Sequence, residues 1–396
     1  MTTWLIQSRD PLIFRDGKPF NATPGARAQS LPFPYPSTLA GGLRTRAGRD
    51  ANDWFDPEQD IDRLRQMRIR GPLLVALDDQ DEVAMWYFPA PADCLFVKPA
   101  VDDEKQGQRY WVRPIMPPEQ AQTNLEHGLQ LVSTNPVVKQ KRHKEAPHFW
   151  NWETLQAWLL HPVNDQKPVA LDSVGILGLT SESRVHVRID GETGTAEEGF
   201  LFQTSSLEFQ RLANDEKPKR LSAVQRYALA IEVGEDANVK EGIDFLGGER
   251  RVVNWTQSKT TFPSCPAEIR EAIIAQKHCR LLLATPAIFE QGYLPRWVCK
   301  NTPELTITVV AAAVSRYEGI SGWDAEKQIP KASRRLTPAG SVYYLSLAGS
   351  ETAINQFINN TWMRTLSDAE QDRLDGFGLA LLGTWDGNID PLGGAR

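Results

Sequence analysis

The chain has 396 residues, of which 41% are apolar and 24% are charged, and its formal net charge is −6. This composition excludes a largely disordered chain, and the length suggests two domains at roughly 150 residues each. The longest apolar run is about the length of Val309–Val314, residues 1–7 hold no basic residue, and a spanning helix would need ~18 apolar residues, so we expect a cytoplasmic protein with no membrane partner.

The predicted elements before residue 215 are short and mixed. The segment Trp4–Ser8 predicts a strand, and the Asp16-Gly17 pair after it predicts a turn. Ser37 or Thr38 can cap a helix that runs to about Arg49. The remaining predictions are helices over Glu58–Arg68 and over Trp152–Leu160 with Asn151 as its cap, and a strand over Val185–Ile189.

A charged segment, Asn214–Arg220, predicts a linker, and we expect an N-terminal domain at 1–215 and a C-terminal domain at 221–396. After it, Tyr227, Leu229, Ile231 and Val233 alternate with smaller residues, which predicts a strand. Further predictions are a helix at Ala267–Gln276, strands at Arg280–Ala284, Leu305–Val314, Ser341–Leu347 and Leu379–Leu382, and a short helix opened by the capping box Ser367-x-x-Glu370.

Each half of the chain therefore mixes several strands with few helices. This pattern favours an α+β protein over a doubly wound α/β protein. Two ferredoxin-like modules, each a split β-α-β unit, account for it.

Charge is segregated along the sequence. Residues 1–50 hold seven Arg or Lys against three Asp, Lys139–Lys144 is a second basic cluster, and Asp53–Asp62 is acidic without a basic residue. This segregation fits one face for a polyanion and another for protein neighbours, although a short charge run can also be a solvated loop. The basic candidates for RNA contacts outside the glycine-rich segments are Arg15, Lys18, Arg46, Lys141 and Arg142.

Motifs for catalysis and metal binding are missing. The sequence has no G-x-S-x-G, Walker A, Rossmann or EF-hand pattern, its four cysteines form no C-x-x-C, and its six histidines have no zinc-site spacing. We therefore expect no catalytic residue, no metal and no cofactor. His143 and His148 beside Lys141 and Lys144 could in principle transfer protons on RNA, but a solvated basic loop is the favoured explanation.

Two glycine-rich segments carry stronger signals. Within the predicted helix, Gly41 and Gly42 cost roughly 1 kcal/mol each relative to alanine, which indicates that something approaches the backbone closely. Either a phosphate held with Arg44 or close helix–sheet packing would explain the pair. The segment Gly247-Gly248, followed by Arg250 and Arg251, suits phosphate contacts or a hairpin turn with exposed arginines.

A third segment predicts a protruding hairpin. Arg184, His186 and Arg188 lie on its first strand, and its tip at 190–199 is rich in glycine. An ordinary surface hairpin is the simpler alternative.

Six segments together make the sequence recognisable. They are RDPLIFRDGKPF (9–20), PYPSTLAGGLR (34–44), HVRIDGETGTAEEGFLF (186–202), FLGGERR (245–251), PAGSVYYL (338–345) and DGFGLALLGTW (375–385). In this order, over nearly the whole chain, they resemble the family of the third subunit of the Cmr complex, the type III-B CRISPR effector, in the RAMP superfamily.

This resemblance implies two ferredoxin-like folds joined face to face in a non-catalytic subunit at the foot of a ribonucleoprotein. The family grips the repeat-derived 5′ tag of the CRISPR RNA and contacts the large polymerase-like subunit and a backbone RAMP subunit, while target RNA is engaged indirectly. The resemblance assigns Ser37, Thr38, Gly41, Gly42, Arg44, Gly247, Gly248, Arg250 and Arg251 to the tag, the 186–199 hairpin to a thumb between tag and guide, and Gly376, Phe377 and Gly378 to the glycine-rich RAMP loop.

Two other functions stay open at this point. A RAMP endoribonuclease that processes the CRISPR RNA precursor would need a His, Tyr or Lys at one scissile phosphate. An adaptor between proteins would never touch RNA.

Overall fold

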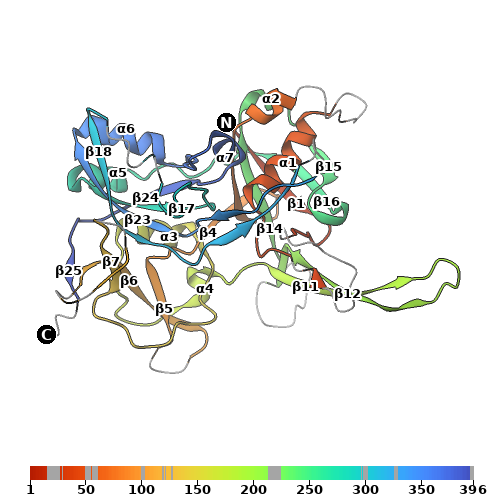
Figure 1. Ribbon diagram of the computed structural model, residues 1–396, viewed down its shortest axis with the longest axis horizontal. Coiled ribbons are helices and arrows are strands. Elements are labelled where there is room, and N and C mark those ends of the chain that lie inside the picture. Colours follow the sequence, from red (N-terminus) through yellow and green to blue (C-terminus); the bar gives the residue numbers. More distant parts are fainter. Residues whose placement is uncertain are drawn as a thin grey trace. The chain divides into compact units, whose positions relative to one another are not determined.

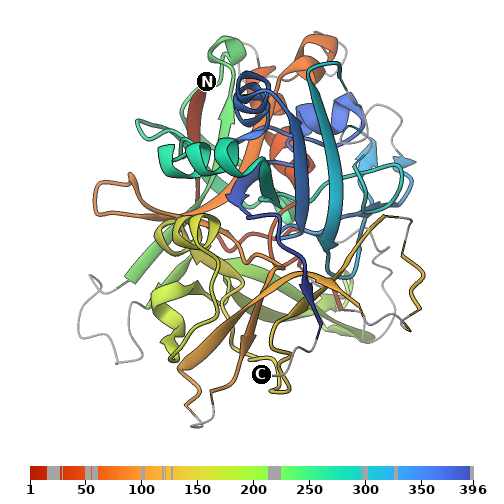
Figure 2. The same ribbon diagram turned by 90° about the vertical axis from the view of Figure 1, so that its left-hand side faces the viewer.

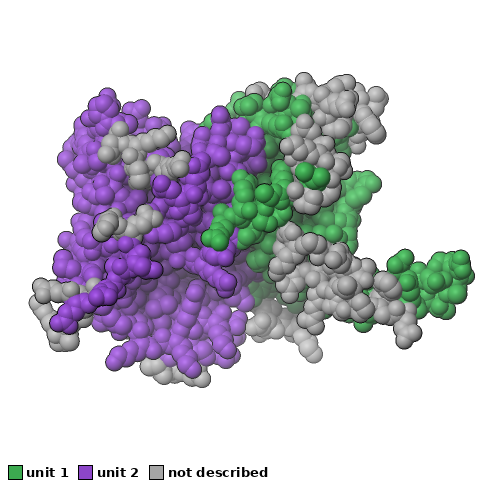
Figure 3. Space-filling model, viewed as in Figure 1, with its two compact units in different colours: residues 1–84, 179–261, 319–335 green, residues 85–178, 262–318, 336–396 purple. Residues whose placement is uncertain are grey.

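The structure is a computed structural model, and it describes residues 1–15, 27–28, 30–49, 55, 61–99, 103–117, 120, 122–125, 128–212, 224–295, 297, 302–324 and 329–392. The chain forms two compact units whose segments alternate along the sequence (Figure 3). Unit 1 holds residues 1–84, 179–261 and 319–335, and unit 2 holds residues 85–178, 262–318 and 336–396. The predicted linker lies outside the described residues, so the division into 1–215 and 221–396 stays a prediction.

The described part of unit 1 combines a main sheet, a long hairpin, a short β20–β21 pair and the helices α1 and α2 (Figure 1). Its elements are β1 (Thr2–Ser8), β2 (Arg27–Ala28), α1 (Pro36–Ala47), α2 (Ile61–Gln66), β3 (Ile69–Leu77), β11 (Thr180–Ile189), β12 (Ala196–Glu208), β13 (Gln210–Leu212), β14 (Val224–Val233), β15 (Gly242–Phe245), β16 (Val252–Ser258), β20 (Trp323–Asp324) and β21 (Ile329–Pro330), with single 3₁₀ turns at Glu235–Ala237 and Gly248–Arg250.

Within unit 1 the main sheet contains the run β3-β14-β1-β16-β15, whose neighbouring strands are antiparallel, and β13 also pairs with β14. Of its four longer strands, the first and third along the chain, β1 and β14, lie in the middle. The predicted alternation in β14 is confirmed as a strand, but the small residues between its large ones are buried as well. A central strand covered on both faces explains that burial.

Helix α1 forms because its apolar residues recur on one side. Leu39, Ala40, Leu43 and Ala47 are all buried, and Pro36 at the first turn has the backbone angle that a helix start requires. The predicted cap is wrong: Tyr35 is the N-cap residue, and Ser37 and Thr38 lie inside the first turn without a side-chain cap. The amide of Thr38 instead donates to the Tyr35 carbonyl at 3.0 Å.

Unit 2 is built from the remaining elements. They are β5 (Cys94–Val97), β6 (Gln106–Met116), β7 (Leu131–Thr134), β8 (Phe149–Asn151), α3 (Trp152–Leu160), β9 (Val169–Ala170), α4 (Leu171–Val174), β10 (Gly175–Ile176), α5 (Ala267–Gln276), β17 (His278–Leu283), β18 (Leu305–Ala313), β23 (Val342–Gly349), α6 (Glu351–Thr361), α7 (Glu370–Asp375), β24 (Ala380–Thr384) and β25 (Asp390–Pro391). Three strands, β4 (Val83–Pro89), β19 (Glu318–Ile320) and β22 (Arg334–Leu336), run past the points where the units divide.

The main sheet of unit 2 has the order β18-β23-β17-β24 and is antiparallel (Figure 2). As in unit 1, the first and third strands along the chain, β17 and β23, lie in the middle. Helices α5 and α6 pack against its strands and against each other. Around β6 a second sheet gathers β5, β7, β9 and β25. Mostly antiparallel sheets with few helices confirm the predicted α+β class.

Two predicted helix starts in unit 2 have different outcomes. Asn151 caps α3 as predicted, because its side-chain oxygen accepts from the Thr154 amide at 2.8 Å. The capping box at Ser367 is wrong, since α7 begins at Glu370 after Ala369. The Ser367 hydroxyl is used in the core, where it accepts from the Ile288 amide at 3.1 Å. Among the described residues, no helix is long and apolar enough to cross a membrane.

A buried ion pair holds unit 2 together. The guanidinium of Arg280 on β17 pairs with Asp93, and the two side chains are 1% and 0% exposed. It also donates to the backbone oxygens of Trp158 and Leu159, which end α3, and of Thr384 on β24. Arg280 therefore joins a strand, a neighbouring strand and the end of a helix by charge-assisted hydrogen bonds.

Removing one partner of this pair should be far more damaging than removing both. We expect Asp93→Ala to lower the free energy of unfolding by about 3–5 kcal/mol, because it leaves a buried guanidinium without its counter-charge. The double variant Asp93→Leu/Arg280→Met should lose less than Asp93→Ala alone. Urea unfolding of the three proteins measures the difference, and equal losses would show that the charge is not what stabilises this region.

Candidate nucleic-acid interface

The predicted RNA-binding residues are distributed over both units. Lys18 lies outside the described residues. Unit 2 holds Lys141, Arg142, Gly376, Phe377 and Gly378. Unit 1 holds all the others: Arg15, Ser37, Thr38, Gly41, Gly42, Arg44, Arg46, Arg184, His186, Arg188, Gly247, Gly248, Arg250 and Arg251.

The two glycines of α1 have different surroundings. A Cβ at Gly42 would lie 2.8 Å from the Leu246 side chain and 3.7 Å from Trp255, so Gly42 allows the helix to pack closely on the sheet. Gly41 is exposed, and a Cβ there would meet nothing within 4 Å. Internal packing therefore explains why position 42 is a glycine. It does not explain Gly41, where the helix backbone is open to solvent.

The arginines of α1 are used largely inside unit 1. Arg46 is buried and pairs with Asp244 at 3.0 Å, and it also donates to the Lys240 and Ile243 carbonyls. Arg44 donates to the Met67 carbonyl at 3.2 Å and is half-buried. These contacts anchor the helix, so the geometry gives little support to either guanidinium as an RNA ligand.

The loop at Leu246–Arg251 has a backbone shape that its glycine requires. Gly247 has φ +77°, and a Cβ there would lie 2.5 Å from the Ile13 carbonyl. The amide of Gly248 donates to that carbonyl at 2.7 Å, and the Leu246 amide donates to the Arg251 carbonyl at 2.9 Å. Gly247 therefore has a structural reason, because only glycine fits this close approach.

The side chains around this loop form a basic surface. Arg15 and Arg250 are exposed, and Arg15 Nε lies 3.6 Å from the position of a Gly248 Cβ. The Arg250 guanidinium sits 4.4 Å above the ring of Phe245, which is 43% exposed. Arg251 pairs with Glu249 at 2.9 Å. We call Arg15, Gly41, Gly248, Arg250 and Arg251 the glycine-loop surface.

The predicted hairpin is confirmed as β11 and β12, which extend from unit 1 as a long ribbon (Figure 1). Its register separates two faces. One face carries Arg184, His186 and Arg188, and the His186 ring stacks on Phe202 with centroids 5.2 Å apart. Arg184 pairs with Glu182 at 2.9 Å and Arg188 with Glu197 at 3.0 Å. This face thus offers cations and an aromatic ring together.

The opposite face of the hairpin is apolar. Val185, Val187, Ile189 and Leu201 are between 41% and 64% exposed. They alternate with the basic face because side chains along a strand point to opposite sides. At the tip, the Asp190 carboxylate accepts from the Glu192 and Thr193 amides, and these hydrogen bonds lower its pKa.

In unit 2, the basic cluster is held by its backbone. The His143 amide donates to the Phe96 carbonyl at 2.9 Å and the Lys98 amide to the Lys141 carbonyl at 3.2 Å, which leaves the Lys141 and Arg142 side chains exposed. His143 itself is buried, and its Nδ1 accepts from the Glu145 amide at 3.1 Å. The alternative prediction, that His143 lies in a solvated basic loop, is therefore wrong for this residue.

The Gly376-Phe377-Gly378 segment is part of the core of unit 2. Phe377 is fully buried, and the Gly376 carbonyl accepts from the Thr285 hydroxyl at 2.8 Å. A Cβ at Gly378 would lie 2.9 Å from the Ser367 amide nitrogen, and its φ is +82°. Packing accounts for these three residues, and the geometry gives no support to an RNA contact by the Phe377 ring.

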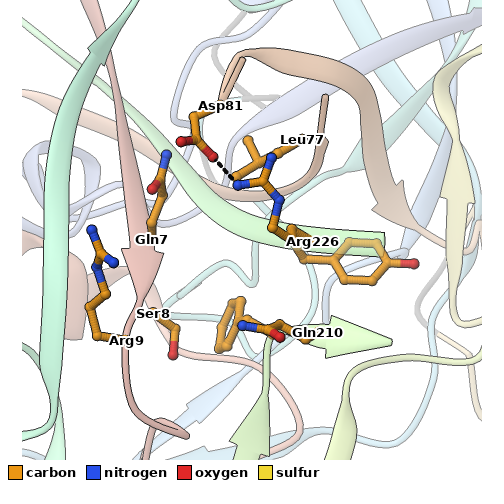
Figure 4. A pocket seen from close by; sticks show the side chains of 9 residues that line it. Gln7, Ser8, Arg9, Leu77, Asp81, Gln210 and Arg226 are labelled. Atoms are coloured by element: carbon orange, nitrogen blue, oxygen red, sulfur yellow. Dashed lines mark hydrogen bonds and ion pairs between the residues drawn. The ribbon is translucent and has the colours of Figure 1, made fainter. Parts of the chain in front are cut away.

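The sequence analysis missed a cavity at one end of the unit 1 sheet (Figure 4). Gln7, Ser8 and Arg9 at the end of β1 line it, together with Leu77, Asp81, Phe209, Gln210, Arg226 and Tyr227. These residues come from four separate parts of the chain and share no spacing. A lone polar residue at a strand end is too common a signal to have indicated them.

The two α1 glycines make a matched test. We expect Gly41→Ala to raise the free energy of unfolding by about 0.5–1 kcal/mol, because it adds helix propensity in open space. Gly42→Ala should gain less or lose stability, since Leu246 must move to admit the new Cβ. Denaturant unfolding measures both, and a destabilised Gly41→Ala protein would mean that Gly41 also has a packing role.

Comparisons with known proteins find matches over nearly the whole chain. A family model described as CRISPR-associated protein (Cas_Cmr3) matches residues 4–385. Three solved structures give matches of 17%, 17% and 10% identity: two of the type III-B Cmr-beta complex bound to cognate target RNA, the first also with AMPPnP, and one of the Csm3–Csm4 subcomplex of the type III-A CRISPR-Cas interference complex.

The matched regions cover 90%, 96% and 88% of this chain and 88%, 96% and 94% of those chains, with TM-scores of 0.47, 0.49 and 0.32. A search of curated proteins finds no match. The family model spans nearly the whole sequence and agrees with the resemblance predicted from six segments in order, so this chain belongs to the Cas_Cmr3 family of CRISPR-associated proteins.

Proposed function

We propose that this chain is a non-catalytic, RNA-binding structural subunit of a type III-B CRISPR effector ribonucleoprotein. It grips the repeat-derived 5′ tag of the CRISPR RNA with unit 1 and joins the large polymerase-like subunit to the backbone RAMP filament. Target RNA meets this subunit only through the assembled complex.

One observation carries the proposal. The start of the chain, the glycine helix and the glycine loop are separated by as many as 235 residues in sequence (Ile13 to Gly248), yet Gly42 packs on Leu246 and Gly248 hydrogen-bonds to Ile13. The glycine-loop surface therefore combines three of the family-like segments. The uncovered backbone at Gly41 and the exposed guanidinium groups of Arg15 and Arg250 suit a phosphate chain.

The ion pairs on this surface do not oppose RNA binding. Arg251 pairs with Glu249, and Arg184 pairs with Glu182, whose pKa is lowered by the hydrogen bond from Arg184. The Arg184–Glu182 pair is solvent-exposed, and pairs of that kind contribute roughly 0–1 kcal/mol, whereas the Arg251 side chain is half-buried. A phosphate can therefore replace Glu182 as the partner of Arg184 at small cost.

The strand orders support two ferredoxin-like folds. Among the four longer strands that each unit contributes to its main sheet, the first and third along the chain lie in the middle, as in a split β-α-β unit. Unit 1 has α1 between its first and second strands, and unit 2 has α6 between its third and fourth. Each unit thus keeps one of the two helices of that fold at its expected place in the chain.

The two-faced hairpin is the proposed thumb between tag and guide. Its stacked His186–Phe202 pair suits contact with an RNA base, and Arg184 and Arg188 suit phosphates. Its apolar face then contacts unstacked bases or a neighbouring subunit.

The first test concerns salt dependence. The variant Arg250→Ala/Arg251→Ala should bind 5′-tagged RNA more weakly, and the slope of log K against log salt should fall by about 0.7 per lost phosphate contact. Filter binding across a salt series measures this slope. Lys259→Ala, which removes an exposed charge at the end of β16, is the matched control and should leave the slope unchanged.

An unaltered slope in the Arg250→Ala/Arg251→Ala protein would remove the loop from the RNA site. In the same samples, repeat RNA should stay intact. A single defined cut would support the endoribonuclease instead, and a failure to crosslink to RNA within the assembled complex would support the adaptor.

The second test shortens the hairpin without shifting its register. Val187 and Leu201 face each other, so Asn-Gly can join them in place of residues 188–200. We expect the unit 1 fold to persist, because loop tips tolerate such shortening, and the nucleotides at the tag–guide junction to change their reactivity. Chemical probing of the complexes checks this. Unchanged reactivity would identify an ordinary surface hairpin.

A further inference from the structure

An exposed aromatic ring lies beside the glycine-loop surface. Phe245 is the last residue of β15, which is the end strand in the order of the main sheet (Figure 1). Its side chain and that of Ile243, on the same face of the strand, are 43% and 67% exposed. Asp244 between them points to the opposite face and is buried. A single exposed apolar side chain is ordinary on a protein surface, so the meaning of this ring depends on what lies against it.

The guanidinium of Arg250 lies against the Phe245 ring. Its central carbon is 4.4 Å from the ring centroid, and Arg250 is itself exposed, so solvent reaches the pair. The negative face of an aromatic ring attracts a cation in this arrangement. Aromatic rings and guanidinium planes are the side-chain groups on which proteins stack unpaired RNA bases. Phe245 and Arg250 bring both groups together at one point of the surface.

The backbone that carries this arginine is in an unfavourable conformation. Glu249 and Arg250 have φ values of +57° and +50°, in the left-handed region that residues other than glycine rarely adopt. Such conformations persist only where surrounding contacts impose them, and they gather at ligand-binding sites. Here the Leu246 amide donates to the Arg251 carbonyl at 2.9 Å and closes the loop. The strained loop thus holds Arg250 over the ring before any ligand arrives.

The charges around the Phe245–Arg250 pair favour RNA over a protein partner. Arg15 is exposed, and its Nε lies 3.6 Å from the position of a Gly248 Cβ, so a second cation lies at the same loop. The carboxylate of the loop, Glu249, is paired with Arg251 at 2.9 Å. Charged residues are depleted at the centre of protein–protein interfaces, whereas sites for single-stranded RNA combine cations with aromatic rings.

We propose that one unpaired base of the bound RNA stacks on the Phe245–Arg250 pair. This inference rests on the proposed function, because it requires RNA at the glycine-loop surface. It adds a base contact to a surface whose other groups suit phosphates, and Phe245 is not among the residues predicted to bind RNA. The stack accepts any base, since every base has a π-face. It therefore fixes the position of one nucleotide without reading its identity.

The experiment combines a Phe245 variant with RNAs that each lack one base. Every nucleotide of a 5′-tagged RNA is replaced in turn by an abasic unit, and filter binding measures the affinity of the full chain for each RNA. At the stacked nucleotide the abasic unit should weaken binding about 10-fold. Phe245→Leu should weaken binding of the intact RNA by a similar factor. It should not weaken binding of that abasic RNA further, because the base and the ring form one contact.

Matched variants separate stacking from other effects. Phe245→Trp keeps a ring and should bind the intact RNA like the unaltered chain, so a loss equal to that of Phe245→Leu would contradict stacking. Tyr317→Leu removes a ring in unit 2 that is 53% exposed, and this control should bind every RNA like the unaltered chain. Because Phe245 and Tyr317 are exposed, these variants should fold, and equal midpoints of urea unfolding check this.

A measurement on the unaltered chain keeps the test decisive if Phe245→Leu does not fold. Stacking quenches the fluorescence of 2-aminopurine. Placed at the nucleotide whose base is needed, this analogue should lose more fluorescence on binding than at the neighbouring nucleotides. Equal fluorescence at all positions would overturn the stack.

Failure of the stack and failure of the proposed function give different results. Phe245→Leu removes no charge, so it should keep the salt slope that Arg250→Ala/Arg251→Ala lowers. If the arginine variant lowers the slope but no abasic position is coupled to Phe245, the surface binds phosphates alone and the stack is overturned. An unaltered slope in the arginine variant removes the RNA site itself. If Phe245→Leu binds every RNA normally but does not assemble with other subunits, Phe245 and Ile243 form a protein contact, which also overturns the stack.

Discussion

The geometry of unit 1 depends on one buried carboxylate. Asp244 on β15 is 4% exposed and accepts from Arg46 at 3.0 Å and from Arg49 at 2.7 Å, both at the end of α1. Its other contact is the Phe245 amide at 2.7 Å. Because charge-assisted hydrogen bonds in a water-poor site are strong and directional, this carboxylate fixes the glycine helix against the strand that leads into the glycine loop. The glycine-loop surface exists only while that arrangement holds.

The same residue type therefore has two roles in this chain. Arg46 and Arg280 are buried, and their guanidinium groups satisfy carboxylates and backbone carbonyls. Arg15 and Arg250 are exposed and face solvent, where a polyanion can reach them. Burying a charge is costly unless it is paired, so the paired arginines hold the fold while the exposed ones carry the proposed RNA contacts. A net charge of −6 is compatible with this, because binding depends on a local surface.

Much of the secondary structure followed from local pattern. The helix at Ala267–Gln276 and the Asn151 cap of α3 were predicted correctly, since amphipathic spacing and an N-cap act within a few residues. The predicted helix caps at Ser37 or Thr38 and at Ser367 were both wrong. At Ser367 the reason is tertiary, because its hydroxyl forms hydrogen bonds in the core with Ile288 and Phe377 instead. The segments of the two compact units alternate along the sequence because strands far apart in the chain pair with each other, as β1 does with β14 across more than 200 residues. No local pattern encodes such pairings.

By itself the sequence determined the α+β class, the family and the segments that carry glycine and arginine together, because composition, periodicity and motif order are properties of the chain alone. Only the tertiary structure distinguished the role of Gly41 from that of Gly42, and the role of Arg250 from that of Arg46. Those pairs are equivalent in sequence, and what distinguishes them is the neighbour each one meets: Leu246 beside Gly42, Asp244 beside Arg46, and open space or an exposed ring for the others. The cavity around Gln7 likewise appears only when the ends of β1, β3 and β14 are brought together, because its lining residues come from separate parts of the chain.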